Sequence, residues 1–244
     1  MNVLQVENLI RSYRKSVIKE SEEDVKVLKG ISFQVAEGEF VGIMGKSGCG
    51  KTTLLKTLGM IDKPTDGTIK FMGEDTSELY GDKLADIRNS KIGFIFQDFY
   101  LMDSLSVEEN IMLPMIISKQ NINKMIAEAK KYAEQFQIEH LLKKNPYELS
   151  GGEKQRVAIA SAIASGKEFL IFDEPTSGLD LKNMMKVSEN LVYLQKLGVT
   201  SFIITHDFEL IMEVCSHILH MEDGKIIDNY KINEEKLENF FLKN

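Results

Sequence analysis

The chain has 244 residues, of which 43% are apolar, enough for a substantial core in one large domain or two small ones. Its net charge of −7 argues against a global field that attracts nucleic acid or anionic lipid. Cys49 and Cys215 are the only cysteines, too few for a disulfide framework. With no leader pattern and no apolar run of roughly 18 residues, we expect a protein of the reducing cytoplasm.

The first hundred residues predict strands around a glycine-rich loop. Apolar runs at residues 3–13 and 25–40 predict antiparallel strands, with the charged stretch 19–24 as a solvated loop between them. A short apolar run at 39–44 predicts a buried strand, and residues 53–58 predict a helix. A Pro-containing turn then precedes a strand at 68–72, and residues 91–97 predict a further buried strand.

The loop between strand 39–44 and helix 53–58 fits the pattern G-x-x-x-x-G-K-[ST]. Its glycines let backbone N–H groups turn toward phosphate oxygens, with Lys51 for the β- and γ-phosphates and Thr52 for Mg²⁺. The helix that follows adds an N-terminus that favours negative charge. The predicted phosphate-binding residues are Gly45, Lys46, Ser47, Gly48, Cys49, Gly50, Lys51, Thr52 and Thr53.

From residue 98 to about 165 the pattern becomes helical. Ser106 and Glu109 have the spacing of a capping box, as do Ser150 and Glu153, and residues 123–138 carry apolar side chains at helical spacing. The apolar runs 99–102 and 111–117 suit either the core of this helical region or a groove for a partner's helix.

The remainder alternates strands and helices, which predicts a parallel α/β core. We expect strands at 168–172, 200–205 and 218–221, helices at 182–197 and 208–216, and a helical tail at 233–244. The strand at 168–172 ends in two carboxylates. Asp173 is placed to hold Mg²⁺ and Glu174 to orient and deprotonate a water molecule, the parts that phosphoryl transfer requires.

The stretch Leu149–Arg156, LSGGEKQR, resembles the signature of ATP-binding cassette (ABC) ATPases. Matching motifs follow the family's order over nearly the whole chain: Tyr13 for stacking on adenine, Gly45–Thr52 for Walker A, Gln97 for the Q-loop, Asp173 and Glu174 for Walker B, Ser177–Asp180 for the D-loop, and His206 for the switch histidine. The resemblance implies an ATPase in which Glu174, His206, Gln97 and Lys51 are catalytic, while Thr52, Gln97 and Asp173 hold Mg²⁺.

The resemblance also implies the fold and the assembly. The fold is that of an α/β P-loop NTPase with an antiparallel β subdomain: one ABC domain over 1–244, with a RecA-like core at about 1–97 and 166–232, a helical subdomain at about 98–165 and a tail at 233–244. Two cassettes, in a homodimer, pair head to tail around ATP. Ser150, Gly151, Gly152 and Asp180 of each then bind the nucleotide held by the other.

The implied function is to energise a separate integral-membrane permease from the inner face of the membrane. Residues 92–117 resemble ATPases of FtsX-like permeases, which export lipoproteins or macrolides or confer resistance to peptide antibiotics. Residues 157–224 resemble energy-coupling-factor ATPases of vitamin and ion importers. Two alternatives remain open: a regulatory ATPase that signals to a membrane partner without transport, and an importer ATPase. A soluble ABC protein of repair or translation is disfavoured.

Overall fold

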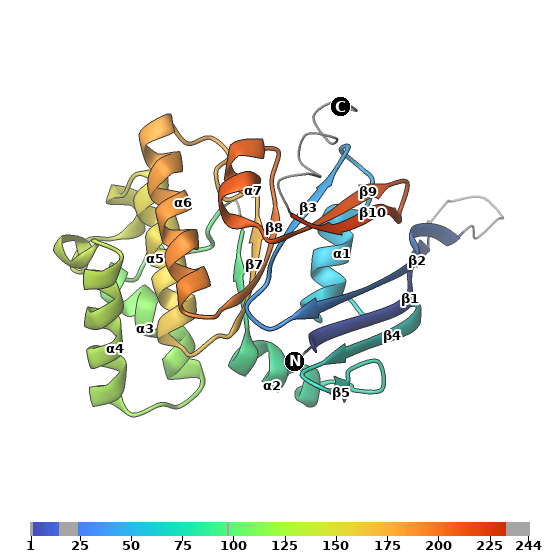
Figure 1. Cartoon of the computed structure of the whole chain (residues 1–244). Helices are drawn as coiled ribbons and strands as arrows, with labels where there is room; N and C mark the ends of the chain where they lie inside the picture. Colours follow the sequence, from blue (N-terminus) through green and yellow to red (C-terminus); the bar gives the residue numbers. More distant parts are fainter. Residues whose placement is uncertain (1, 15–23, 97, 233–244) are drawn as a thin grey trace, which may run out of the picture.

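A computed structural model describes residues 2–14, 24–96 and 98–232, built around two sheets (Figure 1). The first sheet is antiparallel and has the order β2-β1-β4-β5. Its strands are β1 (Asn2–Arg14), β2 (Asp24–Ala36), β4 (Asp66–Phe71) and β5 (Glu74–Asp75). The antiparallel pairing of the first two strands is confirmed. The predicted second strand is too long, however, because the chain turns after Ala36 and enters the other sheet at Phe40.

The second sheet, within the described residues, has six strands in the order β10-β9-β3-β8-β7-β6. The strands are β3 (Phe40–Gly45), β6 (Ile92–Ile95), β7 (Phe169–Asp173), β8 (Thr200–Ile204), β9 (His217–Glu222) and β10 (Lys225–Lys231). Among these six strands only the edge strand β10 pairs antiparallel, so the predicted parallel α/β core is confirmed. Parallel strands place their carboxyl ends at one edge, where such sheets bind ligands.

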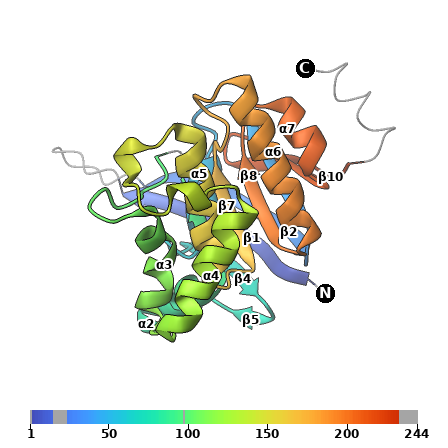
Figure 2. The same ribbon diagram turned by 90° about the vertical axis from the view of Figure 1, so that its left-hand side faces the viewer.

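Helices cover both faces of this sheet (Figure 1, Figure 2). They are α1 (Lys51–Leu58), α2 (Asp82–Lys91), α3 (Val107–Ile117), α4 (Ile122–Gln135), α5 (Gly151–Ala164), α6 (Leu181–Lys196) and α7 (Phe208–Val214), with short 3₁₀ turns at Glu139–Leu141 and Pro146–Glu148. The helix α2 was not predicted: none of its residues is fully buried, and only Leu84 and Ile87 pack, partly buried, against the core, which is too short an apolar stripe to mark a helix. Both predicted capping boxes are present, at the starts of α3 and α5.

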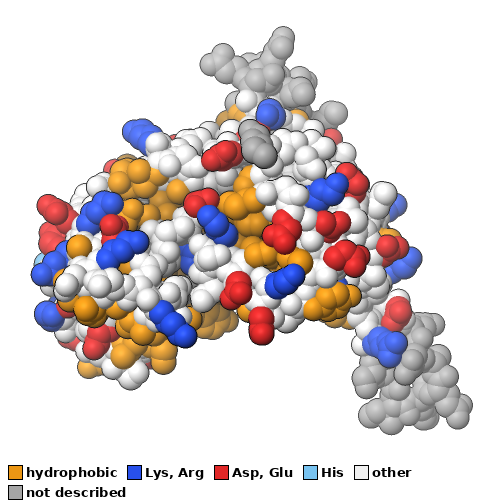
Figure 3. Space-filling view, turned by 90° about the horizontal axis from the view of Figure 1, so that it is seen from below, with side chains coloured by type: hydrophobic (Ala, Val, Ile, Leu, Met, Phe, Trp, Pro, Cys, Tyr) orange, Lys and Arg blue, Asp and Glu red, His pale blue; other side chains and the backbone are white. Residues whose placement is uncertain are grey.

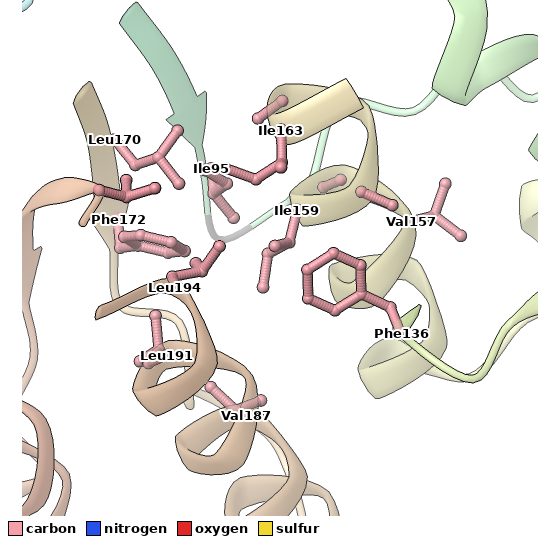
Figure 4. Packing of buried hydrophobic residues seen from close by; sticks show 14 of the residues in the cluster. Ile95, Phe136, Val157, Ile159, Ile163, Leu170, Phe172, Val187, Leu191 and Leu194 are labelled. Atoms are coloured by element: carbon pink, nitrogen blue, oxygen red, sulfur yellow. The ribbon is translucent and has the colours of Figure 1, made fainter. Parts of the chain in front are cut away.

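Two clusters of buried side chains lie on opposite faces of the sheet, and alternate residues of β7 supply both. Phe169 and Ile171 pack with α1 and the antiparallel sheet. Leu170 and Phe172 pack with α5, α6 and the helices beyond them (Figure 4). The sheet is thus buried on both sides, as parallel sheets are. The helices α3, α4 and α5 share their core with it, and α3 and α4 lie at the end of the molecule away from the antiparallel sheet (Figure 1).

The surface mixes both signs of charge with apolar patches, as the view from below shows (Figure 3). Across the described ranges, no helix is both long enough and apolar enough to span a bilayer. Three predictions fall outside the described residues: most of the charged loop at 19–24, the Q-loop residue Gln97, and the helical tail at 233–244.

Candidate active site

The phosphate loop joins β3 to α1 through three glycines with positive φ angles. These angles are 148° at Gly45, 80° at Gly48 and 107° at Gly50, values that residues with side chains rarely adopt. Gly50 is also the N-cap of α1. Among the described residues, no side chain caps this helix and no acidic residue lies in its first turn. The first N–H groups of α1 are therefore available to an anion.

Lys51 begins α1 and folds back over the loop. The residue is only 9% exposed, and its Nζ donates to the carbonyl oxygens of Gly45 at 2.6 Å and Lys46 at 3.0 Å. A positive charge is thus held against the loop backbone, next to the N–H groups at the start of α1. This arrangement suits phosphate oxygens, which pair strongly with a cation and with N–H donors together.

The turn between β9 and β10 braces the phosphate loop from outside. The N–H of Gly224 donates to the carbonyl of Cys49 at 3.0 Å, and the carbonyl of Gly224 accepts from the N–H of Lys29 on β2 at 2.8 Å. A Cβ at position 224 would overlap the carbonyl of Val27, so this approach requires glycine. The bracing turn therefore connects the loop to the antiparallel sheet.

The two carboxylates lie at the end of β7, as predicted: Asp173 is its last residue and Glu174 follows it. Asp173 pairs with Ile204 of the neighbouring strand, and the N–H of Glu174 donates to the carbonyl of Ile204 at 2.8 Å. Glu174 has a φ of 53°, a strain of about 1–3 kcal/mol of the kind that concentrates at functional sites. Burial raises the pKa of the Asp173 carboxyl, although Lys56 and Lys51 act in the opposite direction.

His206 holds the Glu174 carboxylate from two sides. Its ring Nε2 lies 3.1 Å from Oε1, and its backbone N–H donates to Oε2 at 3.3 Å. Burial raises the pKa of Glu174, while the positive charge that His206 can carry and its N–H bond lower it and Asp173 raises it. The net direction is upward. A carboxyl with a raised pKa is a better proton acceptor, which suits a general base.

These groups meet in one cavity of about 370 Å³. Its lining includes most of the predicted phosphate-binding residues together with the carboxylates and the histidine: Ser47, Gly48, Gly50, Lys51, Thr52, Thr53, Asp173, Glu174 and His206, with Val27 and Ile204. Segments far apart in sequence thus form a single site with a cation, backbone N–H donors and a candidate base, the parts that phosphoryl transfer needs.

The donor chemistry of this cavity fits Mg²⁺. The Thr52 hydroxyl and the Asp173 carboxylate both line it, and Mg²⁺ takes oxygen ligands of these kinds. No cluster of three or more His, Cys, Asp or Glu side chains within the described ranges could hold a metal alone. A metal here would share its coordination with phosphate oxygens and water, as Mg²⁺ commonly does.

Tyr13 does not line this cavity. It lies on β1 opposite Val25 of β2, and its hydroxyl donates to Asp62 Oδ2 at 2.5 Å. The guanidinium of Arg11 lies over its ring, 4.3 Å from the centroid. An adenine ring would have to use the other face of Tyr13 or displace Arg11, and the role of Tyr13 stays a prediction.

Ser150, Gly151 and Gly152 begin α5 outside this cavity. Glu153 occupies the helix start, because its Oε2 accepts from the N–H of Ser150 at 2.8 Å and from its hydroxyl at 2.6 Å. Partial burial raises the pKa of Glu153, but the two hydrogen bonds from Ser150 lower it, and the net shift is downward. Asp180, also outside the cavity, caps α6 by accepting from the N–H of Asn183 at 2.9 Å.

Sequence reasoning missed Val27 and Ile204, which complete the cavity lining. Val27 lies on β2, where its carbonyl would be 3.3 Å from a Cβ at Gly50. Ile204 ends β8, beside Asp173. Neither residue carries a local signal, since each reaches the site through packing of the two sheets. The strand ends themselves were predictable, because carboxyl ends of parallel strands share one edge.

Comparisons with known proteins agree on one family. The model described as ABC transporter matches residues 28–177. The uncharacterized ABC transporter ATP-binding protein YvcR of Bacillus subtilis is 40% identical, covering 92% of this chain and 86% of that protein. The ABC transporter ATP-binding protein YxdL of Bacillus subtilis is 38% identical, covering 96% and 89%.

A longer relative is the macrolide export ATP-binding/permease protein MacB of Mannheimia succiniciproducens, 38% identical over 94% of this chain. The chain spans only 35% of the length of that protein. Among solved structures, the dimeric ATP-binding cassette MJ0796, bound to ADP and Pi after hydrolysis, has a TM-score of 0.83 at 34% identity, covering 94% of this chain and 99% of that one. CbiO1 of Clostridium perfringens, part of the transporter complex cbiONQ, has a TM-score of 0.85 at 32% identity, covering 99% and 93%.

Proposed function

This chain belongs to the ABC transporter family, and from that premise we propose that it is the ATP-hydrolysing subunit that energises a separate membrane permease of the export or antimicrobial-peptide resistance type. The observation that carries the proposal is the single cavity that joins Lys51 and the start of α1 to Asp173, Glu174 and His206. YvcR and YxdL, named ATP-binding proteins, are matched over most of their length. MacB, named for macrolide export, supports the export type.

The proposed chemistry is hydrolysis of the terminal phosphoryl group of ATP, in which positioning and charge stabilisation do most of the catalysis. The loop and the start of α1 bind the phosphates, and Lys51 exchanges its two carbonyl partners for phosphate oxygens. Glu174 orients a water molecule and accepts its proton, while His206 keeps the Glu174 carboxylate in position. When bound by Thr52 and Asp173, Mg²⁺ neutralises charge on the phosphate oxygens.

The proposed assembly is a head-to-tail homodimer with ATP between the two copies. Ser150 and Gly151 are exposed at the start of α5, and the nearby start of α6 exposes Leu181 and Met185, at 69% and 60%. Exposed apolar side chains of this size suit an interface. MJ0796, whose cassette this chain resembles, is dimeric. Loss of the bridging phosphate on hydrolysis would favour opening, which turns ATP chemistry into motion.

The proposed permease site is a groove of about 610 Å³ beside the helical region. Ile111 and Met115 are fully buried in the core, as the first interpretation of the apolar runs has it, whereas Leu113, Pro114 and Ile117 line the groove, which supports the second interpretation for them. Aromatic side chains complete its wall: Phe94, Phe96, Phe99 and Tyr100. An apolar groove of this kind accepts an amphipathic helix, here a cytoplasmic helix of the permease. The chain would thus lie at the inner face of the membrane.

A matched pair of substitutions tests the groove. Ile117 and Ile122 are similarly exposed, at 58% and 54%, but only Ile117 lines the groove. Ile117→Glu should weaken binding to the co-expressed permease by roughly 5- to 30-fold, as loss of an interface anchor does, while ATP turnover without the permease stays within about twofold. Ile122→Glu should change neither quantity. Equal effects of the two substitutions would contradict the groove assignment.

Reconstitution with the permease in vesicles tests the transport function. Substrate flux out of the cytoplasmic side that depends on ATP turnover supports the export type. A regulatory ATPase, the alternative, would change the permease's conformation with ATP without any flux. The resemblance of residues 157–224 to energy-coupling-factor ATPases keeps an importer as a second alternative, and flux in the opposite direction would favour it.

A further inference from the structure

The start of α5 packs directly against the start of α6. A Cβ at Gly152 would lie only 2.8 Å from Asn183 Oδ1 and 3.0 Å from Asn183 Cγ. A Cβ at Gly151 would lie 3.2 Å from Leu179 Cδ2. The Asn183 amide therefore lies against the bare Cα of Gly152, a position that any larger residue at 152 would deny it.

The other end of the same amide holds the segment that precedes α6. Asn183 Nδ2 donates to Asp180 Oδ2 at 3.0 Å, and the backbone N–H of Asn183 donates to Asp180 Oδ1 at 2.9 Å. Both oxygens of the Asp180 cap are thus bound to Asn183. One side chain consequently joins the turn 177–180 to the turn 150–152, two segments that are about 30 residues apart in the sequence.

We propose that Asn183 is a positioning residue that fixes the turn 150–152 relative to the turn 177–180, so that each copy presents both turns together to its partner. The inference rests on the proposed head-to-tail dimer. Capping of α6 does not require the Asn183 side chain, because Asp180 Oδ1 accepts from the backbone N–H of residue 183 whatever the side chain there. The contact of the Asn183 amide with Gly152 is the additional feature. It links the start of α5, which faces the second copy in the proposed dimer, to the turn 177–180 beside it.

The first test measures dimer formation separately from nucleotide binding. In a Glu174→Gln background, Asn183→Ala should weaken the ATP-dependent dimer by roughly tenfold, the range expected when contacting groups are uncoupled. Sedimentation in ATP and magnesium gives the dimer dissociation constant. ATP affinity, measured at protein concentrations below dimerisation, should stay within about twofold. Asn190→Ala, on the same helix two turns further along, is the matched control and should leave the dimer unchanged.

The second test is a double-mutant cycle with Gly152→Ala. If the Asn183 amide lies against residue 152, Gly152→Ala should weaken the dimer more when Asn183 is present than in the Asn183→Ala protein. A general loss of stability would give additive effects and lower thermal stability in step, and additive effects overturn the inference.

The outcomes distinguish a failure of the proposed role of Asn183 from a failure of the proposed dimer. If the Glu174→Gln protein dimerises with ATP but Asn183→Ala leaves that dimer unchanged, the inference is wrong and the proposed function stands. If the Glu174→Gln protein stays monomeric at all concentrations with ATP and magnesium, the proposed dimer is wrong, and the inference falls with it.

Discussion

The helices α1 and α5 begin in opposite ways. The start of α1 has a glycine as its N-cap, no acidic residue in its first turn and the Lys51 ammonium close by. The start of α5 carries the Glu153 carboxylate, which accepts hydrogen bonds from the N–H and the hydroxyl of Ser150. Each helix start carries partial positive charge, but only the start of α5 holds a carboxylate in its own first turn. Phosphate reaching α5 must compete with Glu153.

The largest effect, on ATP turnover, is expected from a substitution that stops hydrolysis and leaves both helix starts unchanged. Glu174→Gln should reduce ATP turnover by roughly 100- to 10,000-fold, because it removes the proposed general base. ATP binding should persist, and a dimer should accumulate with ATP and magnesium, visible by gel filtration. Glu168→Gln, an exposed carboxylate just before β7, is the control. Unchanged turnover in the Glu174 variant would overturn its assignment.

Removing the Lys51 cation from the start of α1 should show how much this helix start contributes to ATP binding, separately from the start of α5. Lys51→Ala should weaken ATP binding by roughly 10- to 150-fold, the worth of a hydrogen bond to a charged group. Titration of the monomer with a fluorescent ATP analogue measures this. Lys70→Ala removes an exposed lysine from β4 and should leave affinity unchanged. Equal affinities of the wild type and the Lys51 variant would show that the loop backbone suffices.

Removing the negative charge from the start of α5 should make it more like α1. Glu153→Gln should tighten the ATP-dependent dimer by roughly two- to fivefold, since a charge near a helix N-terminus contributes on that scale. The control is the equivalent box on α3, where Glu109 Oε2 accepts from the N–H and hydroxyl of Ser106 at 2.7 and 2.8 Å. Both substitutions should cause a small loss of thermal stability of similar size, but Glu109→Gln should leave dimerisation unchanged. A weaker dimer in the Glu153 variant would show that the carboxylate helps present Ser150 instead of competing for it.

The smallest expected effect is a shift in pH dependence at the α1 cavity. Glu174 must be ionised to act as a base, so turnover falls as pH falls through its pKa. Burial raises that pKa, and the charge of His206 lowers it. Asp173 also raises it, and Lys51 lowers it. His206→Ala should therefore raise the pKa of Glu174 and move the acidic limb of the residual activity to higher pH. A limb moved to lower pH in the pH–rate profile would contradict this coupling.

The starts of α1 and α5 were both predictable because the sequence patterns that specify them consist of residues close together in the chain. The phosphate loop and the two capping boxes are short patterns with a local mechanism, and the structure contains the loop geometry and both boxes. The contact between Gly152 and Asn183, in contrast, depends on how two helices pack. Val27 reaches the cavity in the same way, and α2 was not predicted because none of its residues is fully buried. The role of Gln97, outside the described residues, stays a prediction.

The bracing glycine at the β9–β10 turn has a consequence for biosynthesis. Gly224, whose N–H donates to the carbonyl of Cys49, lies 175 positions after Cys49 in the chain. At typical ribosomal speeds, the brace emerges roughly 10 to 35 seconds after the loop that it supports. A nascent chain therefore carries its nucleotide loop without this support until the β9–β10 hairpin has left the ribosome, and ATP binding at full strength should begin only then.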